Sequence, residues 1–239
     1  INVDKTKKTK NILYAQAGWV TAVINASAAA VLETIQQHPN VFGKTYAAIN
    51  GIKGVLEEDL VDLSDIDDAT IDQLKYQPGA AFQACRFDLD PLEHNPEQYQ
   101  RVLEVFKTYD IGYFLYNGGN GSMVTAQKVA DYCCENGHPV ICVGVAKTVD
   151  NDLDISHCSP GFGSAAKYVA TSFIEATLDV MSMHETSTKF YIMEAMGRNT
   201  GWLTIAAGLV KEVIPDAPLI VLPAECKFNK QAFLDKVDA

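Results

Sequence analysis

The chain has 239 residues, of which 48% are hydrophobic and 21% charged, so it has enough apolar surface to fold as a globular protein. Its formal net charge of −11 repels a nucleic-acid backbone, so we expect no nucleic-acid partner. The composition shows no apolar run long enough to cross a bilayer and no secretory signal, so we expect a cytoplasmic protein without membrane contact.

Strand-length apolar runs alternate along the chain with longer segments that have the apolar spacing of helices. In chain order, we expect strands at 11–16, 44–49, 112–116, 139–145, 189–195 and 219–222, and helices at 21–37, 96–109, 122–135, 163–183, 201–211 and 230–238. This alternation predicts an α/β fold with doubly wound, mostly parallel sheets. Residues 51–95 contain breakers and a run of acidic residues, and their pattern supports no assignment.

Pro160, Gly161 and Gly163 lie close together after the fourth expected strand, which indicates a hinge between two lobes. We therefore expect an N-terminal lobe over 1–158 and a second lobe over 159–239. The last expected helix reaches the end of the chain without a Gly or Pro stop signal. On this pattern the second lobe is incomplete and the chain is an N-terminal portion of a longer protein.

The residues that directly follow each strand carry the candidate site, because ligands of an open parallel sheet bind outside the carboxyl ends of its strands. Five such segments contain informative residues: AGW at 17–19, NGGNGS at 117–122, AKTVDND at 146–152, MGRNTG at 196–201 and PAE at 223–225. We expect the segments to meet at one edge of the sheet.

Two of these segments have the chemistry of a phosphate site and of an acid–base site. GGNGS joins a strand to a helix, where backbone N–H groups and the helix dipole attract anions, although such a loop is often only a tight connection. Asp150 and Asp152 could accept a proton and orient a metal or a hydroxyl, or they could simply cap an Asx-turn. Arg198 has a planar guanidinium that suits phosphate, and Glu225 follows the last strand.

Five segments together resemble the phosphofructokinase family, most closely its long pyrophosphate-dependent branch. They are YAQAGWVTAVINAS, PGAAFQACR, YNGGNGS, KTVDNDL and MEAMGRNTGW. The resemblance spans residues 11 to about 225. It implies the two-lobed α/β fold of that family and a glycolytic enzyme. The implied reaction transfers a phosphoryl group from pyrophosphate to the C1 hydroxyl of fructose 6-phosphate, giving fructose 1,6-bisphosphate, with Mg²⁺ as cofactor. ATP as donor is a lesser alternative.

The resemblance also implies roles for individual residues. Those that match the catalytic machinery are Asp150 as general base, Asp152 as its supporting carboxylate, and Thr148 and Arg86 on the transferred group. Those that match the donor site are Gly18, Gly119, Asn120, Gly121, Ser122 and Lys147, with Asn120 and Asp152 as the metal ligands. Those that match the sugar-phosphate site are Met196, Gly197, Arg198, Glu225 and Lys189. Lys189 matches a residue that reaches a neighbouring subunit, which implies a homo-oligomer or a hetero-oligomer with a related subunit.

Trp19 and Gly121 depart from the family pattern, which usually has glycine at the first position and, in pyrophosphate users, aspartate at the second. Trp19 either adds bulk to the donor loop or packs as an apolar staple before the next helix. An active phosphotransferase is favoured by Asp150, Asp152 and Lys147. A weak or silent paralogous subunit that binds sugar phosphate and regulates an active partner is favoured by Trp19 and Gly121. A GGDGT-type kinase acting on dinucleotides or lipids is a third possibility, against which MGRNTG argues.

Overall fold

The computed structural model describes residues 9–238 of the chain. By its internal contacts the chain divides into unit 1, which ends at Lys147, and unit 2, which begins at Thr148. The boundary that the sequence predicted, between residues 158 and 159, lies inside unit 2. No helix among residues 9–238 is long and apolar enough to span a membrane.

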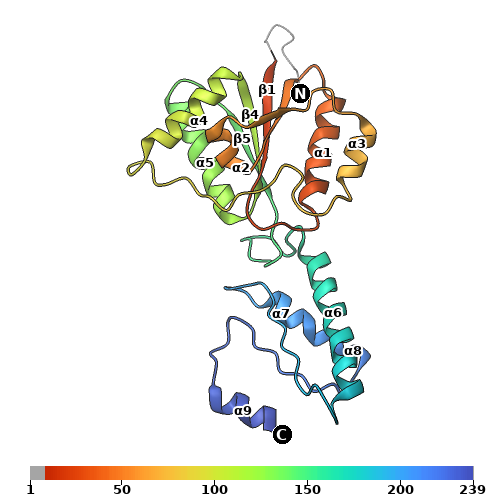
Figure 1. Cartoon of the computed structure of the whole chain (residues 1–239). Coiled ribbons are helices and arrows are strands. Elements are labelled where there is room, and N and C mark those ends of the chain that lie inside the picture. The colour runs from red at the N-terminus through yellow and green to blue at the C-terminus, as the bar shows by residue number, and fades with distance from the viewer. Residues whose placement is uncertain (1–8, 239) are drawn as a thin grey trace. The chain divides into compact units, whose positions relative to one another are not determined.

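Unit 1 contains a five-stranded sheet with the strand order β3-β2-β1-β4-β5 (Figure 1). The strands are β1 (Lys10–Gln16), β2 (Phe42–Ala48), β3 (Leu60–Asp62), β4 (Ile111–Gly118) and β5 (Ile141–Ala146). All neighbouring pairs are parallel except β2 and β3, which are antiparallel. The four strands predicted before residue 150 are present, and the α/β fold predicted from the alternation is confirmed.

Helices cover both faces of this sheet, as a doubly wound topology requires. Helices α1 (Ile24–Gln37) and α3 (Asp68–Leu74) pack on one face, and α2 (Gly51–Glu57), α4 (Pro96–Thr108) and α5 (Asn120–Glu135) pack on the other (Figure 1). Successive side chains of β1 alternate between the two hydrophobic cores on either face of the sheet. Leu13 and Ala15 belong to one buried cluster and Tyr14 to the other. A strand buried on both faces reads as a continuous apolar run, which is why the sequence located it.

The segment that the sequence left unassigned, 51–95, contains α2, β3 and α3. These elements have 7, 3 and 7 residues, which is too short for a helical or alternating apolar period to repeat. Helix α3 nevertheless begins at a recognisable signal, because the Asp67 side chain accepts a hydrogen bond from the backbone N–H of Thr70.

Unit 2 contains α6 (Phe162–Met183), α7 (Trp202–Ala206), a 3₁₀ turn (Ala207–Leu209), α8 (Val210–Val213) and α9 (Lys230–Asp238). The predicted helix over 201–211 is therefore interrupted, at a turn that contains the poor helix former Gly208. The predicted strands at 189–195 and 219–222 are wrong, because neither segment pairs with another within the described part of unit 2.

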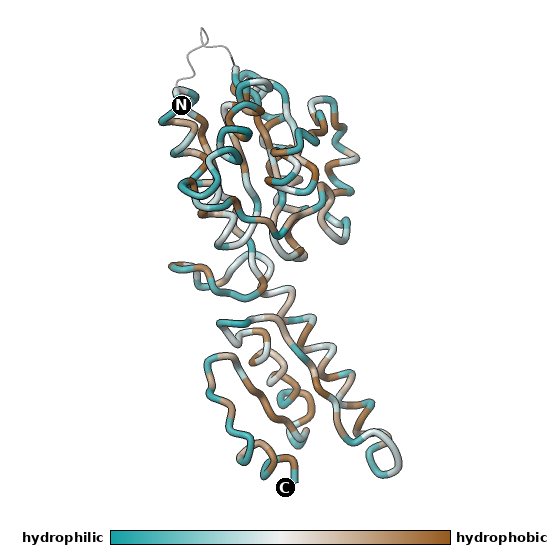
Figure 2. Tube along the Cα trace, turned by 60° about the vertical axis from the view of Figure 1, so that its left-hand side comes forward, coloured by the Kyte–Doolittle hydropathy of each residue, from teal (hydrophilic) through white to brown (hydrophobic). Residues whose placement is uncertain are grey.

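A strand exists only through its pairing, so β propensity alone does not make one. Phe190 and Ile192 of the 189–195 segment are 66% and 88% exposed, although both are strand formers. Figure 2 shows that hydrophobic stretches occur in both units of the chain. Unit 2 thus contains the apolar segments that the sequence indicated, but among the described residues these segments do not form a sheet.

A buried polar network joins the irregular 77–82 segment to the sheet of unit 1. The Gln16 side chain is fully buried; its amide nitrogen donates to Asn25 Oδ1 at 3.1 Å, and its Oε1 accepts from the Phe82 N–H at 3.2 Å. The Asn25 amide donates to the carbonyls of Gln77 and Gly79 at 2.8 and 2.9 Å, and Asn25 Oδ1 accepts from the Ala81 N–H at 2.9 Å. The 77–82 segment, which leads to Arg86, is therefore held by side-chain hydrogen bonds and not by the backbone hydrogen bonds of a sheet.

Asn25→Ala is expected to lower the free energy of unfolding by about 3 kcal/mol, because it removes three hydrogen bonds to part-buried backbone groups and leaves the buried Gln16 amide without its Asn25 partner. Urea unfolding followed by circular dichroism measures the change. The matched control is Asn136→Ala, which removes an exposed asparagine that bonds to the Tyr132 carbonyl and is expected to cost well under half as much. Equal losses in the two variants would show that the network does not hold the segment.

Candidate functional site

The predicted donor residues of unit 1 meet at the carboxyl edge of its sheet. The Ala17 N–H donates to the Asn117 carbonyl at 2.8 Å, and the Lys147 N–H donates to the Gly118 carbonyl at 3.1 Å. The Gly18 N–H donates to the Cys85 carbonyl at 2.9 Å, which brings the segment before Arg86 to the same place. Four stretches that are distant in the sequence are thereby fixed side by side.

The GGNGS loop opens helix α5, which begins at Asn120 and has 16 residues. Gly119 occupies the N-cap position without a side-chain cap, and the first turn contains no acidic residue. A side-chain carbon at Gly118 would overlap the Ser122 hydroxyl, so only glycine lets the helix begin this close to the end of β4. The positive end of a helix suits an anion such as a phosphate.

Trp19 contacts two cations that the sequence assigned to the site, Arg86 of the catalytic set and Lys147 of the donor set. The Arg86 guanidinium carbon lies 4.6 Å from the centroid of the Trp19 ring, and the Lys147 ammonium donates a hydrogen bond to the Trp19 carbonyl. The Trp19 side chain is 56% exposed, so the interpretation of Trp19 as an apolar staple is wrong. Lys147 is only 2% exposed, and this burial fixes the position of its charge.

Asp88 supplies a carboxylate beside Gly121, where the sequence had appeared to lack one. A side-chain carbon built on Gly121 would lie 3.1 Å from Asp88 Oδ1 and 3.5 Å from Oδ2. The carboxylate of a residue 33 positions earlier, in an irregular segment, thus occupies the space in front of the helix, and no sequence pattern could have revealed it.

The loop carries oxygen groups of the type that magnesium binds. No cluster of three or more His, Cys, Asp or Glu side chains occurs among residues 9–238. Mg²⁺ usually binds through one or two carboxylates and completes its shell with water and substrate phosphates. Asp88 and the Asn120 amide provide oxygen donors of this kind in unit 1, so the residues present are compatible with the ion.

The predicted catalytic loop lies in unit 2, and its turn is held by Thr148 and Asn151. Thr148 Oγ1 accepts from the Asp150 N–H at 3.1 Å and donates to Asp152 Oδ1 at 3.3 Å. Asn151 has a positive φ of 56°, and its Oδ1 accepts from the Ser159 N–H at 2.8 Å. The backbone N–H of Thr148 donates to the Pro160 carbonyl at 3.1 Å, which closes the loop.

Hydrogen bonds join this loop to the other predicted sugar-phosphate segments. Thr200 Oγ1 donates to the Asp150 carbonyl at 2.7 Å, and the Gly201 N–H donates to Glu225 Oε1 at 2.9 Å. The Gly201 N–H also lowers the pKa of the Glu225 carboxyl below its ordinary value. Three motifs separated by up to 75 positions (225 minus 150) are therefore linked within unit 2. The role of Thr200 was missed because a threonine before a helix reads as a cap.

The remaining sugar-side residues lie around MGRNTG. Gly197 has a φ of 129°, and a side chain there would overlap the Thr200 carbonyl, so this tight turn requires glycine. Arg198 follows it and is exposed. Lys189 and Met196 are both exposed; Lys189 is the first residue of the segment that the sequence predicted as a strand, and Met196 directly follows that segment.

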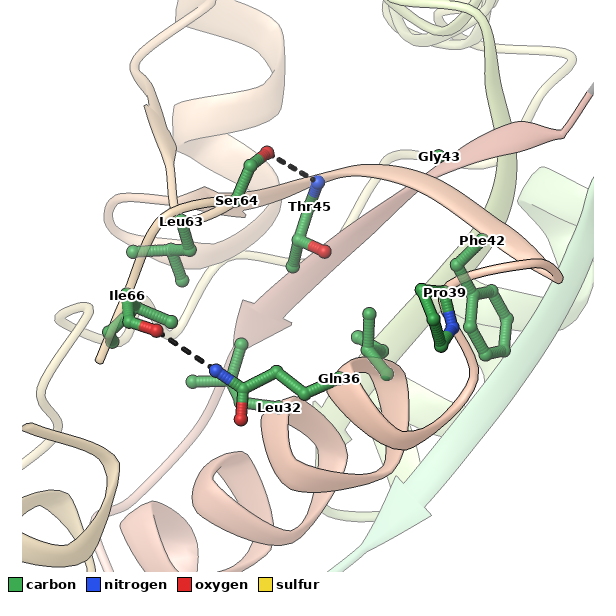
Figure 3. A pocket seen from close by; sticks show the side chains of 10 residues that line it. Leu32, Gln36, Pro39, Phe42, Gly43, Thr45, Leu63, Ser64 and Ile66 are labelled. Atoms are coloured by element: carbon green, nitrogen blue, oxygen red, sulfur yellow. Dashed lines mark hydrogen bonds between the residues drawn. The ribbon is translucent and has the colours of Figure 1, made fainter. Parts of the chain in front are cut away.

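A cavity elsewhere in unit 1 is separate from these loops. It measures about 180 Å³ and is lined by α1, the start of β2 and residues 63–66 (Figure 3). The Gln36 amide donates to the Ile66 carbonyl at 2.9 Å, and the Thr45 N–H donates to Ser64 Oγ at 3.1 Å. These polar groups of the cavity are thus hydrogen-bonded to one another. Because β1 and β2 are parallel, the start of β2 lies at the edge of the sheet opposite the loops that follow β1 and β4.

Comparisons with known proteins give a consistent result. The family model described as phosphofructokinase matches residues 11–239. The pyrophosphate–fructose 6-phosphate 1-phosphotransferase of Methylococcus capsulatus is 48% identical over 96% of this chain and 54% of its own length. The enzyme of the same name from Xanthomonas campestris is 51% identical over 95% of this chain and 54% of its length.

A crystal structure agrees with this result. The pyrophosphate-dependent phosphofructokinase of Marinobacter aquaeolei superposes with a TM-score of 0.87 at 50% identity, over 96% of this chain and 56% of that one. The chain thus spans about half the length of the relatives that it matches.

Proposed function

The chain belongs to the phosphofructokinase family, and from this premise we propose that the protein transfers a phosphoryl group from pyrophosphate to the C1 hydroxyl of fructose 6-phosphate. The product is fructose 1,6-bisphosphate, an intermediate of glycolysis. The observation that best supports the proposal is the Thr200 hydrogen bond to the Asp150 carbonyl, because it joins the acid–base loop to the sugar-phosphate turn.

On the acceptor side, Asp150 takes the proton of the C1 hydroxyl and Asp152 supports it. Phosphoryl transfer has a loose transition state with little covalent chemistry for the protein to perform, so a carboxylate of modest basicity suffices. Thr148 orients the loop through its bonds to both aspartates. Arg198 pairs with the 6-phosphate, for which the planar guanidinium is suited. Glu225 accepts a hydrogen bond from a sugar hydroxyl.

On the donor side, the glycine-rich start of α5 binds pyrophosphate through residues 119–122 and the backbone near Gly18. Lys147 neutralises the leaving phosphate, and Arg86 stabilises charge on the group in transfer. Asn120 would hold magnesium, with Asp88 as a further carboxylate at the loop, and by the family likeness Asp152 would be the second ligand. When bound, magnesium withdraws charge from the phosphate oxygens. Lys189 is exposed and, by the family likeness, serves a neighbouring subunit, so we propose an oligomer.

A paired assay of the complete protein with pyrophosphate and with ATP tests this proposal. Each reaction contains fructose 6-phosphate, with magnesium present or omitted, and fructose 1,6-bisphosphate is quantified. We expect magnesium-dependent product with pyrophosphate and a slower rate with ATP. Binding of fructose 6-phosphate without product from either donor would contradict the proposal and would indicate a silent subunit.

A further inference from the structure

Trp19 is an exposed aromatic residue with two specific contacts, both to cations. The Arg86 guanidinium lies over its ring, and its carbonyl oxygen accepts a hydrogen bond from the Lys147 ammonium. Both contacts occur next to the first turn of α5, because the Lys147 N–H bonds to Gly118. An indole that is 56% exposed contributes little to stability through burial. The main effect of the Trp19 side chain is therefore its contact with Arg86, and its backbone carbonyl adds the contact with Lys147.

We propose that Trp19 is a positioning residue for the phosphate donor, holding Arg86 with its ring and Lys147 with its carbonyl oxygen. The inference rests on the proposed function, since it assumes that these cations bind pyrophosphate. It assigns a role to a residue that the sequence alone marked only as a departure.

A guanidinium that lies over an aromatic ring can still bind a phosphate. A cation–π contact uses the face of the guanidinium, whereas its five N–H groups point outward in its plane. Arginine has many rotamers, and fixing one of them before the ligand arrives removes part of the ordering cost of binding. The ring therefore orders Arg86 without competing for the hydrogen bonds that a phosphate needs.

The two contacts can be separated by substitution. The Lys147 ammonium bonds to the backbone carbonyl of Trp19. A substitution of the Trp19 side chain therefore preserves this hydrogen bond, as long as it does not distort the loop. The Arg86 contact needs an aromatic face. Trp19→Leu removes that face and keeps an apolar side chain, whereas Trp19→Phe keeps a smaller face.

The expected result is that Trp19→Leu binds pyrophosphate about two- to fivefold more weakly than the wild-type protein, the range for a cation–π contact at an exposed site. Trp19→Phe should recover most of the affinity. Calorimetric titration of the complete protein with pyrophosphate, without sugar, measures this. A thermal melt of each variant should show an unchanged midpoint, because the side chain is exposed.

Tryptophan emission gives a second readout that a purely structural role would not produce. Titration with pyrophosphate should change the emission of the wild-type protein, because the bound phosphate adds negative charge beside the cation that lies over the indole. The change should persist in Trp202→Phe, which removes the other tryptophan of the chain, and vanish in Trp19→Phe. Arg86→Gln should also abolish it.

The outcomes separate this inference from the proposed function. If the wild-type protein does not bind pyrophosphate, the proposed function fails and the role of Trp19 fails with it. If the wild-type protein binds pyrophosphate and Trp19→Leu binds it equally well or more tightly, only the role of Trp19 is refuted. Tighter binding would mean that the indole withholds Arg86 from the donor.

Discussion

Asp150→Asn is expected to reduce formation of fructose 1,6-bisphosphate by about 10²- to 10⁴-fold, the usual contribution of a positioned general base. The asparagine amide has the same shape as the carboxylate but cannot take the C1 proton. The bond that holds the loop to Thr200 uses the Asp150 backbone carbonyl, so it survives the substitution. Binding of fructose 6-phosphate should therefore be almost unchanged, which calorimetry can measure alongside the rate.

The matched control is Asp154→Asn, which makes the same chemical change at an exposed position of the same segment. It should leave the rate close to that of the wild-type protein. Full turnover in Asp150→Asn would remove Asp150 from the role of general base. Loss of both turnover and fructose 6-phosphate binding would instead mean that Asp150 holds the sugar.

Lys147→Met is expected to lower kcat/KM for pyrophosphate by about 10²- to 10³-fold, as removal of one preorganised charge from a site does. Methionine is about as long as lysine and apolar, so it can occupy a position that is only 2% exposed. The Lys147 backbone N–H, which bonds to the Gly118 carbonyl, is retained. The loss should therefore come from the missing ammonium and not from a displaced strand end.

Lys128→Met provides the comparison, because Lys128 lies exposed on α5 and its loss removes the same charge from the same unit. It should change kcat/KM by less than twofold in our expectation, or about 0.4 kcal/mol. Equal effects of the two substitutions would show that only the overall charge of the unit matters. A rate with pyrophosphate that is unaffected in Lys147→Met would exclude the proposed role on the leaving phosphate.

The elements of unit 1 were predictable where burial imposes a pattern. Strand β4 is apolar along most of its length because helices cover both faces of the sheet, and α4 repeats its apolar residues over 13 positions. Helices α2 and α3 are too short for such a repeat. In unit 2 the 189–195 segment has the composition of a strand, but the described residues offer it no partner, and pairing is not a property of one segment.

The sequence by itself determined four strands and the longer helices of unit 1, the family, and the loops that carry the candidate chemistry, because each of these is recognised from short stretches of neighbouring residues. Only the tertiary structure decided that Asp88 lies beside Gly121, that the Arg86 guanidinium lies over the Trp19 ring, and that Thr200 donates a hydrogen bond to the Asp150 backbone. These contacts join residues that are 33, 67 and 50 positions apart (121 minus 88, 86 minus 19, 200 minus 150). Contacts at such separations arise from the packing of whole elements, and no local period or propensity encodes them.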